Sequence, residues 1–269
     1  MQKLNVTQKK RMGTVELNTP KKLNSLDLDM VMAIEEAFKT WSHDESIKAA
    51  VLKGKGQKGF CAGGDVVSVI DSLSTQGLEG TEFFEWEYRM DYQVHCFSKP
   101  LLAMANGVTM GGGLGLMNGA SHRVVCETTL MAMPEITIGF FPDVGAGRFL
   151  KKCPEEGLGL FLALTGARFS GADAVYLGLA DYYVNAEELP ALEKEWHESD
   201  FQDDVCPRYE VRMPVSKIES SLEELKPFLE AESIEDFDEL ARNYRGANEW
   251  IASALENYKK GSPLSAAII

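Results

Sequence analysis

The sequence predicts an α/β fold that ends in a layer of helices. In the first 150 residues, short segments typical of strands alternate with segments in which apolar residues recur at helical spacing. From about residue 150 onward the pattern is helical. With 269 residues, of which 45% are hydrophobic, the chain can form one large α/β domain or a domain with a smaller appendage.

The first part of the chain contains more predicted strands than a simple doubly wound sheet requires. Residues 13–18 alternate polar and apolar side chains like a short strand, whereas residues 28–41 have the spacing of an amphipathic helix. Three later apolar segments are predicted to be strands: 48–53, 101–105 and 123–125. The turn Asn106-Gly107 and a glycine-rich stretch with helical potential separate the last two strands.

Helices are predicted throughout the last third. Four segments have helical spacing: 156–165, 171–179, 217–231 and 234–259. The last two are acidic and amphipathic, and charge runs such as Glu219 to Glu224 are typical of solvated helix faces. This part is therefore expected to form a helical layer.

The charge balance argues against nucleic acid and membrane partners. Lys and Arg number 27 and Asp and Glu 41, so the formal net charge is -14. Such a surface repels phosphate backbones and anionic lipid. An anionic small molecule can still bind where a few local cations and backbone N–H groups gather.

Cysteine usage and the absence of targeting signals indicate a reducing compartment inside the cell. The five cysteines are odd in number and show no CxxC spacing, so neither a disulfide framework nor a zinc ribbon is predicted. The start is polar and basic, and no run of about 18 apolar residues follows. We expect the bacterial cytoplasm or, in a eukaryote, the mitochondrial matrix.

The first candidate motif is the Phe60–Asp65 segment, FCAGGD, which follows a predicted buried strand. Small residues let the backbone approach a ligand and point an N–H group at it, as an oxyanion-binding loop requires. A plain turn between strand and helix uses similar residues, so both interpretations stay open.

The second candidate is the glycine-rich segment at 107–116, GVTMGGGLGL. Three successive glycines that open an apolar helix leave several N–H groups unpaired, with the positive end of the helix dipole behind them. Because such glycines cost helix stability, either anion binding or close packing should explain them.

The third candidate is the segment at 133–145, MPEITIGFFPDVG, which carries Glu135 and Asp143 among apolar residues. Apolar surroundings disfavour the ionised form of a carboxyl group, which suits a base, an acid or a nucleophile. The alternative is that one carboxylate caps a helix and the other is a surface charge.

Other catalytic patterns are excluded. No phosphate-binding G-x-x-x-x-G-K-[ST] loop and no G-x-S-x-G nucleophile elbow occurs. Leu150 stands where a dinucleotide fingerprint would need its third glycine. The four histidines are scattered singly, so no metal site is expected.

In this order, the three motifs resemble the enoyl-CoA hydratase/isomerase (crotonase) superfamily. The resemblance implies a ββα superhelix with a C-terminal helical layer. It also implies a core domain over residues 1–195 and a helical C-terminal region over 196–269, shorter than in the family. The family forms its oxyanion hole from two backbone N–H groups, which here belong to Gly64 and Gly112. Metal ions and separate cofactors play no part, because coenzyme A enters as part of the substrate.

Within this superfamily the chain looks most like the branch that hydrolyses 3-hydroxyisobutyryl-CoA, a thioester of valine breakdown. That likeness is carried by TMGGGLGL at 109–116, AMPEITIGFFPDVG at 132–145, LALTG at 162–166 and the segment from Phe84 to Tyr88, FEWEY. The resemblance makes Glu135 and Asp143 catalytic and lets Glu87 contact the substrate. Gly115 stands where hydratases carry a second catalytic Glu.

Further substrate contacts are implied at Ala62, Gly63 and Lys22. Thr19-Pro20 replaces the Arg-Pro common in the family, so Lys21 or Lys22 would supply the contact to the coenzyme A phosphates.

The expected function is hydrolysis of a short 3-hydroxyacyl-CoA. The alternatives are another crotonase reaction, such as hydration or isomerisation of an enoyl-CoA, and a non-catalytic subunit that binds coenzyme A. The expected partner is the acyl-CoA substrate, together with further copies of the chain in a homo-oligomer.

Overall fold

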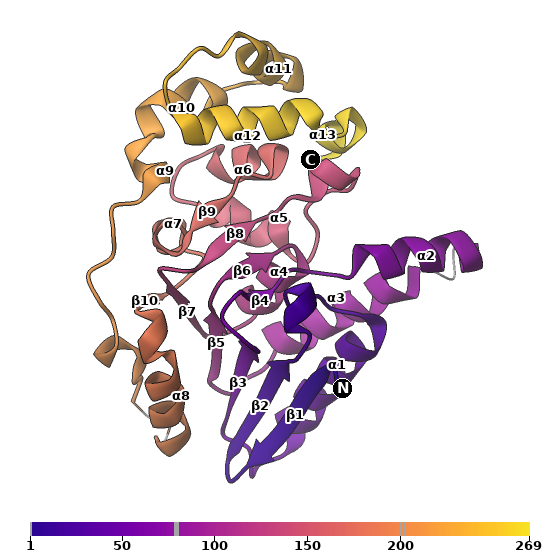
Figure 1. The fold of residues 1–269 in the computed structure, drawn as a ribbon, viewed down its shortest axis with the longest axis vertical. Helices are drawn as coiled ribbons and strands as arrows, with labels where there is room; N and C mark the ends of the chain where they lie inside the picture. The colour runs from indigo at the N-terminus through magenta and orange to yellow at the C-terminus, as the bar shows by residue number, and fades with distance from the viewer. Residues whose placement is uncertain (1, 78–80, 200, 202) are drawn as a thin grey trace.

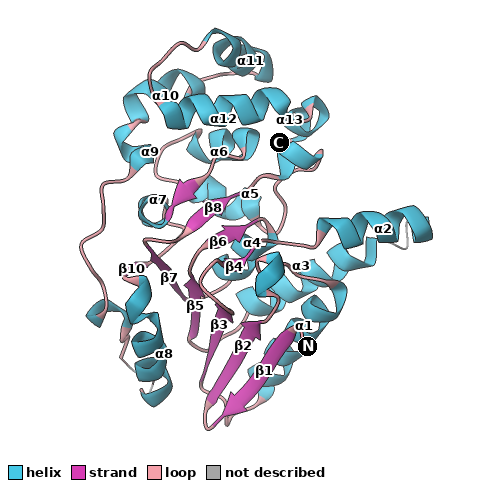
Figure 2. Ribbon diagram, viewed as in Figure 1, coloured by secondary structure: helices cyan, strands magenta, loops and turns pink. Residues whose placement is uncertain are grey.

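Two sheets and a C-terminal layer of helices make up the protein (Figures 1 and 2). The computed structural model describes residues 2–77, 81–199, 201 and 203–269. Within these ranges the larger sheet has six strands, in the order β1-β2-β3-β5-β7-β10. They are Leu4–Lys9 (β1), Met12–Leu17 (β2), Ala49–Gly54 (β3), Leu101–Ala105 (β5), His122–Cys126 (β7) and Tyr182–Val184 (β10). β1 and β2 form an antiparallel hairpin, and the strands from β2 to β10 are parallel.

The smaller sheet follows the order β4-β6-β8-β9. Its strands are Gly59–Cys61 (β4), Val108–Met110 (β6), Leu130–Ala132 (β8) and Phe169–Ser170 (β9). Along the chain, a strand of the larger sheet is followed by one of the smaller sheet, as in β3–β4, β5–β6 and β7–β8. Helices follow each pair, which confirms the expected strand–strand–helix repeat.

Helices surround both sheets. In chain order they are Leu28–His43 (α1), Val66–Gln76 (α2), Glu82–His95 (α3), Gly112–Asn118 (α4), Ala146–Phe149 (α5), Leu158–Thr165 (α6), Gly171–Tyr176 (α7), Leu189–Glu198 (α8), Lys217–Ser220 (α9), Leu222–Leu229 (α10), Ile234–Asn243 (α11), Glu249–Lys260 (α12) and Pro263–Ile268 (α13). Short 3-10 turns are Pro20–Lys22 (η1), Glu135–Ile138 (η3), Leu150–Lys152 (η4), Ala186–Glu188 (η5) and Cys206–Arg208 (η6). Among the described helices, none is both long and apolar enough to cross a membrane.

The strand and helix predictions at 13–18, 28–41, 48–53, 101–105 and 123–125 are confirmed. The region predicted as helical at 234–259 is two helices, because the chain leaves the helical path after Asn243 and restarts where Asn248 caps α12. The start of the chain, interpreted only as polar and basic, forms edge strand β1. Residues 6–9 of this strand are exposed, and Leu4 is the only one of its six residues that is buried, so the strand has no alternation of buried apolar residues.

The main core lies between the larger sheet and helices α1 and α3. Helix α1 begins where the Asp27 carboxylate accepts a hydrogen bond from the Met30 N–H, and it buries Ile34, Phe38 and Trp41. A second cluster covers the other face of the sheet, where α8 places Leu192 and Trp196 against β-strand residues. Both faces are therefore buried, as a parallel sheet requires.

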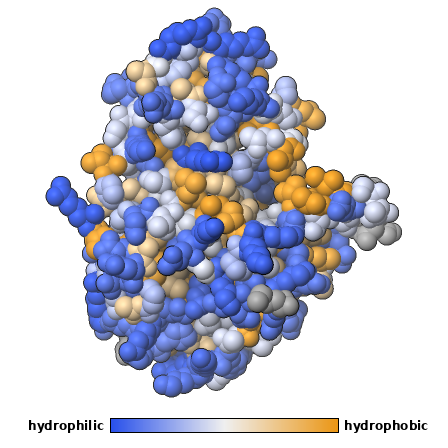
Figure 3. All heavy atoms as spheres, viewed as in Figure 1, coloured by the Kyte–Doolittle hydropathy of each residue, from blue (hydrophilic) through white to orange (hydrophobic). Residues whose placement is uncertain are grey.

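Helix α2 extends away from the body of the molecule (Figure 1). Val67 and Ile70 on this helix are exposed, with 69% and 58% of their surface accessible. The space-filling view shows apolar surface over the start of this helix, whereas the surface over α10 and α11 is polar (Figure 3).

The C-terminal layer is organised around α6, whose residues are almost all buried. Phe161 lies at its centre and packs against the rings of Phe228, Phe237 and Trp250 from three different C-terminal helices. Next to it, the Ser262 N–H donates a 3.0 Å hydrogen bond to the carbonyl of Ile136 in η3. The layer thus contacts the turn that begins with Glu135.

Candidate active site

The first wall of the site is the loop after β4. The Leu26 N–H donates to the Gly63 carbonyl at 2.8 Å, and the Asp65 N–H donates to the Leu26 carbonyl at 2.7 Å. Gly63 has a φ of +89°, which a residue with a side chain rarely adopts. In the part of the chain that the structure describes, the Gly64 N–H has no acceptor. The loop therefore holds one N–H group ready for a ligand.

The second wall is the start of α4. Gly112 is the first residue of the helix, so its N–H has no partner inside the helix. A Cβ built on Gly63 would lie 3.2 Å from the Gly112 nitrogen, so the two glycine segments are in contact. The structure thus brings together the loops that carry Gly64 and Gly112.

Glu135 faces this pair of loops. It is the first residue of η3 and is 7% exposed. Its Oε1 lies 2.8 Å from the position that a Cβ on Gly111 would occupy. Its Oε2 is buried, with no hydrogen-bond partner among the described residues. Burial raises the pKa of Glu135 to about 7, and the nearby charge of Asp143 adds to the shift.

Glu87 comes from α3 and is 3% exposed. Its Oε1 lies 2.2 Å from the position that a Cβ on Gly112 would occupy, so a side chain at Gly112 would displace the Glu87 carboxyl group. Burial, together with the charges of Asp143 and Glu135, raises the pKa of Glu87 to about 8. Glu87 is therefore mostly protonated at neutral pH.

Asp143 is half-buried and lies on the loop after η3. It accepts a 2.7 Å hydrogen bond from the Tyr88 hydroxyl, which raises the pKa of Tyr88 together with burial. Burial raises the pKa of Asp143 itself, and the Tyr88 bond opposes that shift. Glu87, Glu135 and Asp143 thus form one interacting set of carboxylates, with no ion pair to any of them among the described side chains.

The predicted contacts to coenzyme A lie at the edge of this site. Lys22 in η1 is exposed and donates a 2.6 Å hydrogen bond to Asp65, the residue after Gly64. The Ala62 N–H is used in a 3.0 Å bond to the Leu23 carbonyl. Lys22 is thus held beside the loop, where its ammonium group can reach an anionic ligand.

Two nearby residues, Tyr88 and Asp91, were not predicted from the sequence as site residues. Both lie on α3, and Asp91 follows Glu87 by one helical turn. The sequence did indicate that this helix contributes to the site, because Glu87 falls on the helix stripe that buries Phe83, Met90 and Val94. A charged residue on an apolar stripe indicates a functional role.

The arrangement suits acyl transfer. Within the described ranges, no group of three His, Cys, Asp or Glu side chains is placed to hold a metal ion. Instead, unpaired N–H groups lie next to a buried carboxylate, which is the geometry that stabilises a developing oxyanion beside a base or nucleophile.

A family model described as enoyl-CoA hydratase/isomerase matches residues 12–269. The chain belongs to this family. A carnitinyl-CoA dehydratase of this fold, from Mycobacterium thermoresistibile, has a TM-score of 0.92 and 33% identity; the match covers 100% of this chain and 78% of that one. The crotonase resemblance of the sequence and its ββα architecture are thereby confirmed.

Two curated relatives carry different names. The 3-hydroxyisobutyryl-CoA hydrolase, mitochondrial, of Danio rerio is 39% identical over 248 residues, which cover 92% of this chain and 63% of that protein. The small ribosomal subunit protein mS47 of Neurospora crassa is 41% identical over 187 residues, 67% of this chain and 36% of that protein. This member of the enoyl-CoA hydratase/isomerase family thus spans less than two thirds of either relative.

Proposed function

We propose that the chain hydrolyses the thioester of a short 3-hydroxyacyl-CoA, with 3-hydroxyisobutyryl-CoA as the leading substrate. The observation that carries this proposal is that Glu135, a buried carboxylate on η3, faces the unpaired N–H groups, while α4 carries no glutamate opposite it. A Cβ on Gly115 would lie 2.5 Å from the Val144 Cβ, so the α4 helix has no room for a second glutamate there. A reaction that needs paired glutamates is therefore disfavoured.

The N–H groups of Gly64 and Gly112 would bind the thioester carbonyl oxygen. Negative charge develops on this oxygen when the acyl carbon is attacked, and a preorganised donor stabilises it by about 3 kcal/mol. Because both donors are backbone N–H groups, no side chain has to rearrange when the charge forms. The acyl carbon is then the reaction centre.

Glu135 would act in its ionised form on that carbon. Two routes share this requirement: the carboxylate attacks the carbon and forms an anhydride, or it removes a proton from an attacking water. In both, the carbon–sulfur bond breaks and the departing thiolate takes up a proton. In the first route a water molecule then cleaves the anhydride, which releases the acid and restores the Glu135 carboxylate. A pKa of about 7 keeps a large fraction of Glu135 ionised near neutral pH while leaving it basic enough to accept a proton.

The other carboxyl groups would bind the 3-hydroxyl end of the acyl group. Protonated Glu87 can donate a hydrogen bond next to Gly112, and Asp143, oriented by Tyr88, can accept one from the substrate hydroxyl or help to protonate the thiolate. Lys22, with the backbone at Ala62 and Gly63, would contact coenzyme A. No separate cofactor or metal enters this scheme, and the homo-oligomer and the compartment inferred from the sequence remain proposals beside it.

A role in a larger assembly is the second candidate, because mS47 of Neurospora crassa is a ribosomal protein of the same family at 41% identity. The net charge of -14 does not favour an RNA-rich partner. The buried carboxylates at Glu87 and Glu135 cost stability, which a purely structural subunit has no reason to keep.

A thiol-release assay tests the proposal. The full chain is incubated with 3-hydroxyisobutyryl-CoA, 3-hydroxypropionyl-CoA, isobutyryl-CoA and crotonyl-CoA. We expect free thiol from the two hydroxylated substrates, with kcat/KM higher than for isobutyryl-CoA. Consumption of crotonyl-CoA without thiol would point to hydration or isomerisation, and binding of coenzyme A without any turnover would support the assembly role.

A further inference from the structure

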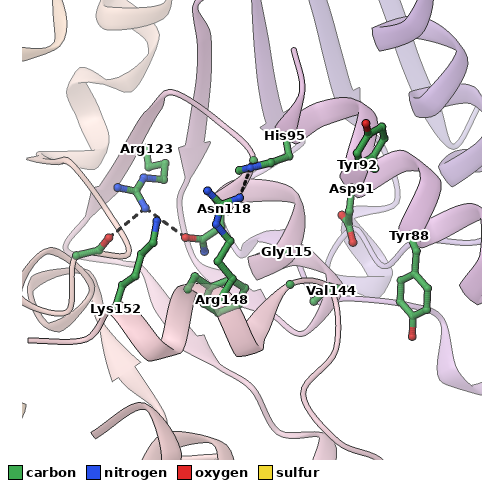
Figure 4. A pocket seen from close by; sticks show the side chains of 14 residues that line it. Tyr88, Asp91, Tyr92, His95, Gly115, Asn118, Arg123, Val144, Arg148 and Lys152 are labelled. Atoms are coloured by element: carbon green, nitrogen blue, oxygen red, sulfur yellow. Dashed lines mark hydrogen bonds between the residues drawn. The ribbon is translucent and has the colours of Figure 1, made fainter. Parts of the chain in front are cut away.

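A cavity of about 540 Å³ lies beside the candidate active site but does not include its catalytic atoms. One side is formed by α3, through Tyr88, Asp91, Tyr92 and His95. The opposite side is formed by the segment from Val144 to Lys152 (Figure 4). Gly64, Gly112 and Glu135 are not among its lining residues. It therefore needs an explanation of its own.

The α3 side of this cavity ends in a carboxyl group without a partner. Both carboxyl oxygens of Asp91 are buried, and neither has a hydrogen bond to any described residue. Buried polar groups are nearly always hydrogen-bonded, so an unpaired one indicates a missing partner. The partner that fits a carboxyl oxygen is a hydrogen-bond donor.

The opposite side carries two cations, Arg148 and Lys152. Neither forms an ion pair with a carboxylate in the described part of the chain, although Arg148 contacts the His95 ring. A third cation, Arg123, already has a partner, because two of its nitrogens donate hydrogen bonds to Asp181. Arg148 and Lys152 are thus free to hold an anion.

We propose that this cavity binds a short hydroxy-carboxylate, the carboxylate against Arg148 and Lys152 and the hydroxyl against Asp91. The ligand's identity rests on the proposed function, since hydrolysis of a 3-hydroxyacyl-CoA frees an acid of this class. A volume of 540 Å³ lies in the range usual for small-molecule sites and leaves room for bridging water.

The acyl chain of the bound thioester is a poor alternative occupant. A hydrocarbon tail would leave the buried Asp91 carboxyl group without a partner, at the cost that burying an unpaired polar group carries, and it offers no charge to the two cations. The acid offers a carboxylate to the two cations and a hydroxyl to Asp91. It would also touch Tyr88, which lines the cavity and binds Asp143, so an occupied cavity lies one hydrogen bond away from the reaction site.

The test is a calorimetric titration of the full chain with 3-hydroxyisobutyrate in the presence of saturating coenzyme A, which occupies the coenzyme A part of the substrate's site; the Arg148 and Lys152 variants then distinguish the cavity from the acyl part of that site. We expect binding, and affinity at least about tenfold lower for isobutyrate, which has no hydroxyl for Asp91. Lys152→Gln and Arg148→Gln should each weaken binding of the hydroxy acid at least about fivefold. Both side chains are exposed, so these variants should fold normally.

Lys151→Gln is the matched control, since Lys151 is also exposed but lines a different groove. Asp91→Asn should abolish the preference for the hydroxy acid, or reduce it to under threefold. Equal affinities for the Lys151 and Lys152 variants, or no binding of the hydroxy acid, would overturn the inference.

The two proposals fail separately. A chain that binds 3-hydroxyisobutyrate at this cavity but releases no thiol from any acyl-CoA would contradict the proposed function and keep the second site. A chain that releases thiol yet shows no binding of the acid, or binding that coenzyme A displaces, would keep the function and remove the second site.

Discussion

The Tyr88 hydroxyl donates a 2.7 Å hydrogen bond to Asp143 Oδ2, and this bond joins α3 to the loop after η3. The two residues are 55 positions apart in sequence. Because Tyr88 also lines the neighbouring cavity, the bond is where the two sites meet.

Tyr88→Phe removes this hydrogen bond and keeps the ring. The bond opposes the effect of burial on Asp143, so its loss should raise the pKa of Asp143 and lower kcat for hydroxylated acyl-CoAs by about tenfold. The pH profile of kcat should shift toward higher pH, which a loss of packing alone would not cause. Tyr182→Phe, which removes a Tyr–Asp contact far from the site, is the control and should leave the profile unchanged.

Glu135→Gln keeps the shape of the side chain but removes the base or nucleophile. Turnover should fall at least about a hundredfold while coenzyme A binding is retained, as measured by thiol release and calorimetry. Glu156→Gln, at an exposed position, should behave like the parent chain. A kcat within about threefold of the parent would remove Glu135 from the mechanism and make Glu87 the next residue to test.

Turnover should rise with pH through about 7, because Glu135 must lose its proton before it can act and its pKa is about 7. Because Glu135, Glu87 and Asp143 interact, the midpoint of this pH profile belongs to the three carboxyl groups together and not to Glu135 alone. Thioester absorbance measured from pH 5.5 to 8.5 checks this. A flat profile across this window would show that ionisation of Glu135 does not limit the reaction.

Gly112→Ala places a methyl group where Glu87 Oε1 now lies. The backbone N–H remains, but the methyl group must move it or the Glu87 carboxyl group out of place, so we expect kcat to fall by up to about two orders of magnitude, the lower end of the effect of losing an oxyanion donor. The crowding should also lower the free energy of unfolding by about 1–3 kcal/mol. Gly147→Ala is the control: its Cβ would meet nothing within 4 Å, so urea unfolding and kcat should both stay close to the parent values.

Glu87→Gln should make stability less dependent on pH. Its pKa is about 8 in the folded chain and near 4.3 when unfolded, so between these values the folded state binds more protons and the free energy of unfolding falls as pH rises. Urea unfolding at pH 5.5 and 8.5 should show a smaller difference for the variant. Glu85→Gln, an exposed change on the same helix, should keep the parent's difference.

The sequence was sufficient for β2, β3, β5 and β7 of the larger sheet and for the loops of the site, for different physical reasons. β5 is buried along its whole length, so its apolar run LLAMA is visible without context. The glycines at 63, 64 and 111–113 are visible because their backbone must approach other groups closely, as the Glu87 contact at Gly112 shows.

The smaller sheet and part of the site could not be predicted from local pattern. β4, β6 and β8 have three residues each, too few for any periodicity to appear. The positions of Tyr88 and Asp91 depend on how α3 packs beside α4 and the loop at Asp143, which is a tertiary relationship. Sequence spacing reveals the helix, and only the fold reveals what its polar groups face.

The hydrogen bond from Ser262 to the Ile136 carbonyl makes the turn that carries Glu135 part of the C-terminal layer's cooperative unit. Local opening of α12 and α13 would release this turn while both sheets stay folded, because the strands share no hydrogen bonds with that layer within the described residues. Heat or denaturant would then abolish catalysis before the sheets unfold. Amide exchange in η3 would follow that of α12 rather than that of β8, although Glu135 follows β8 directly in the chain.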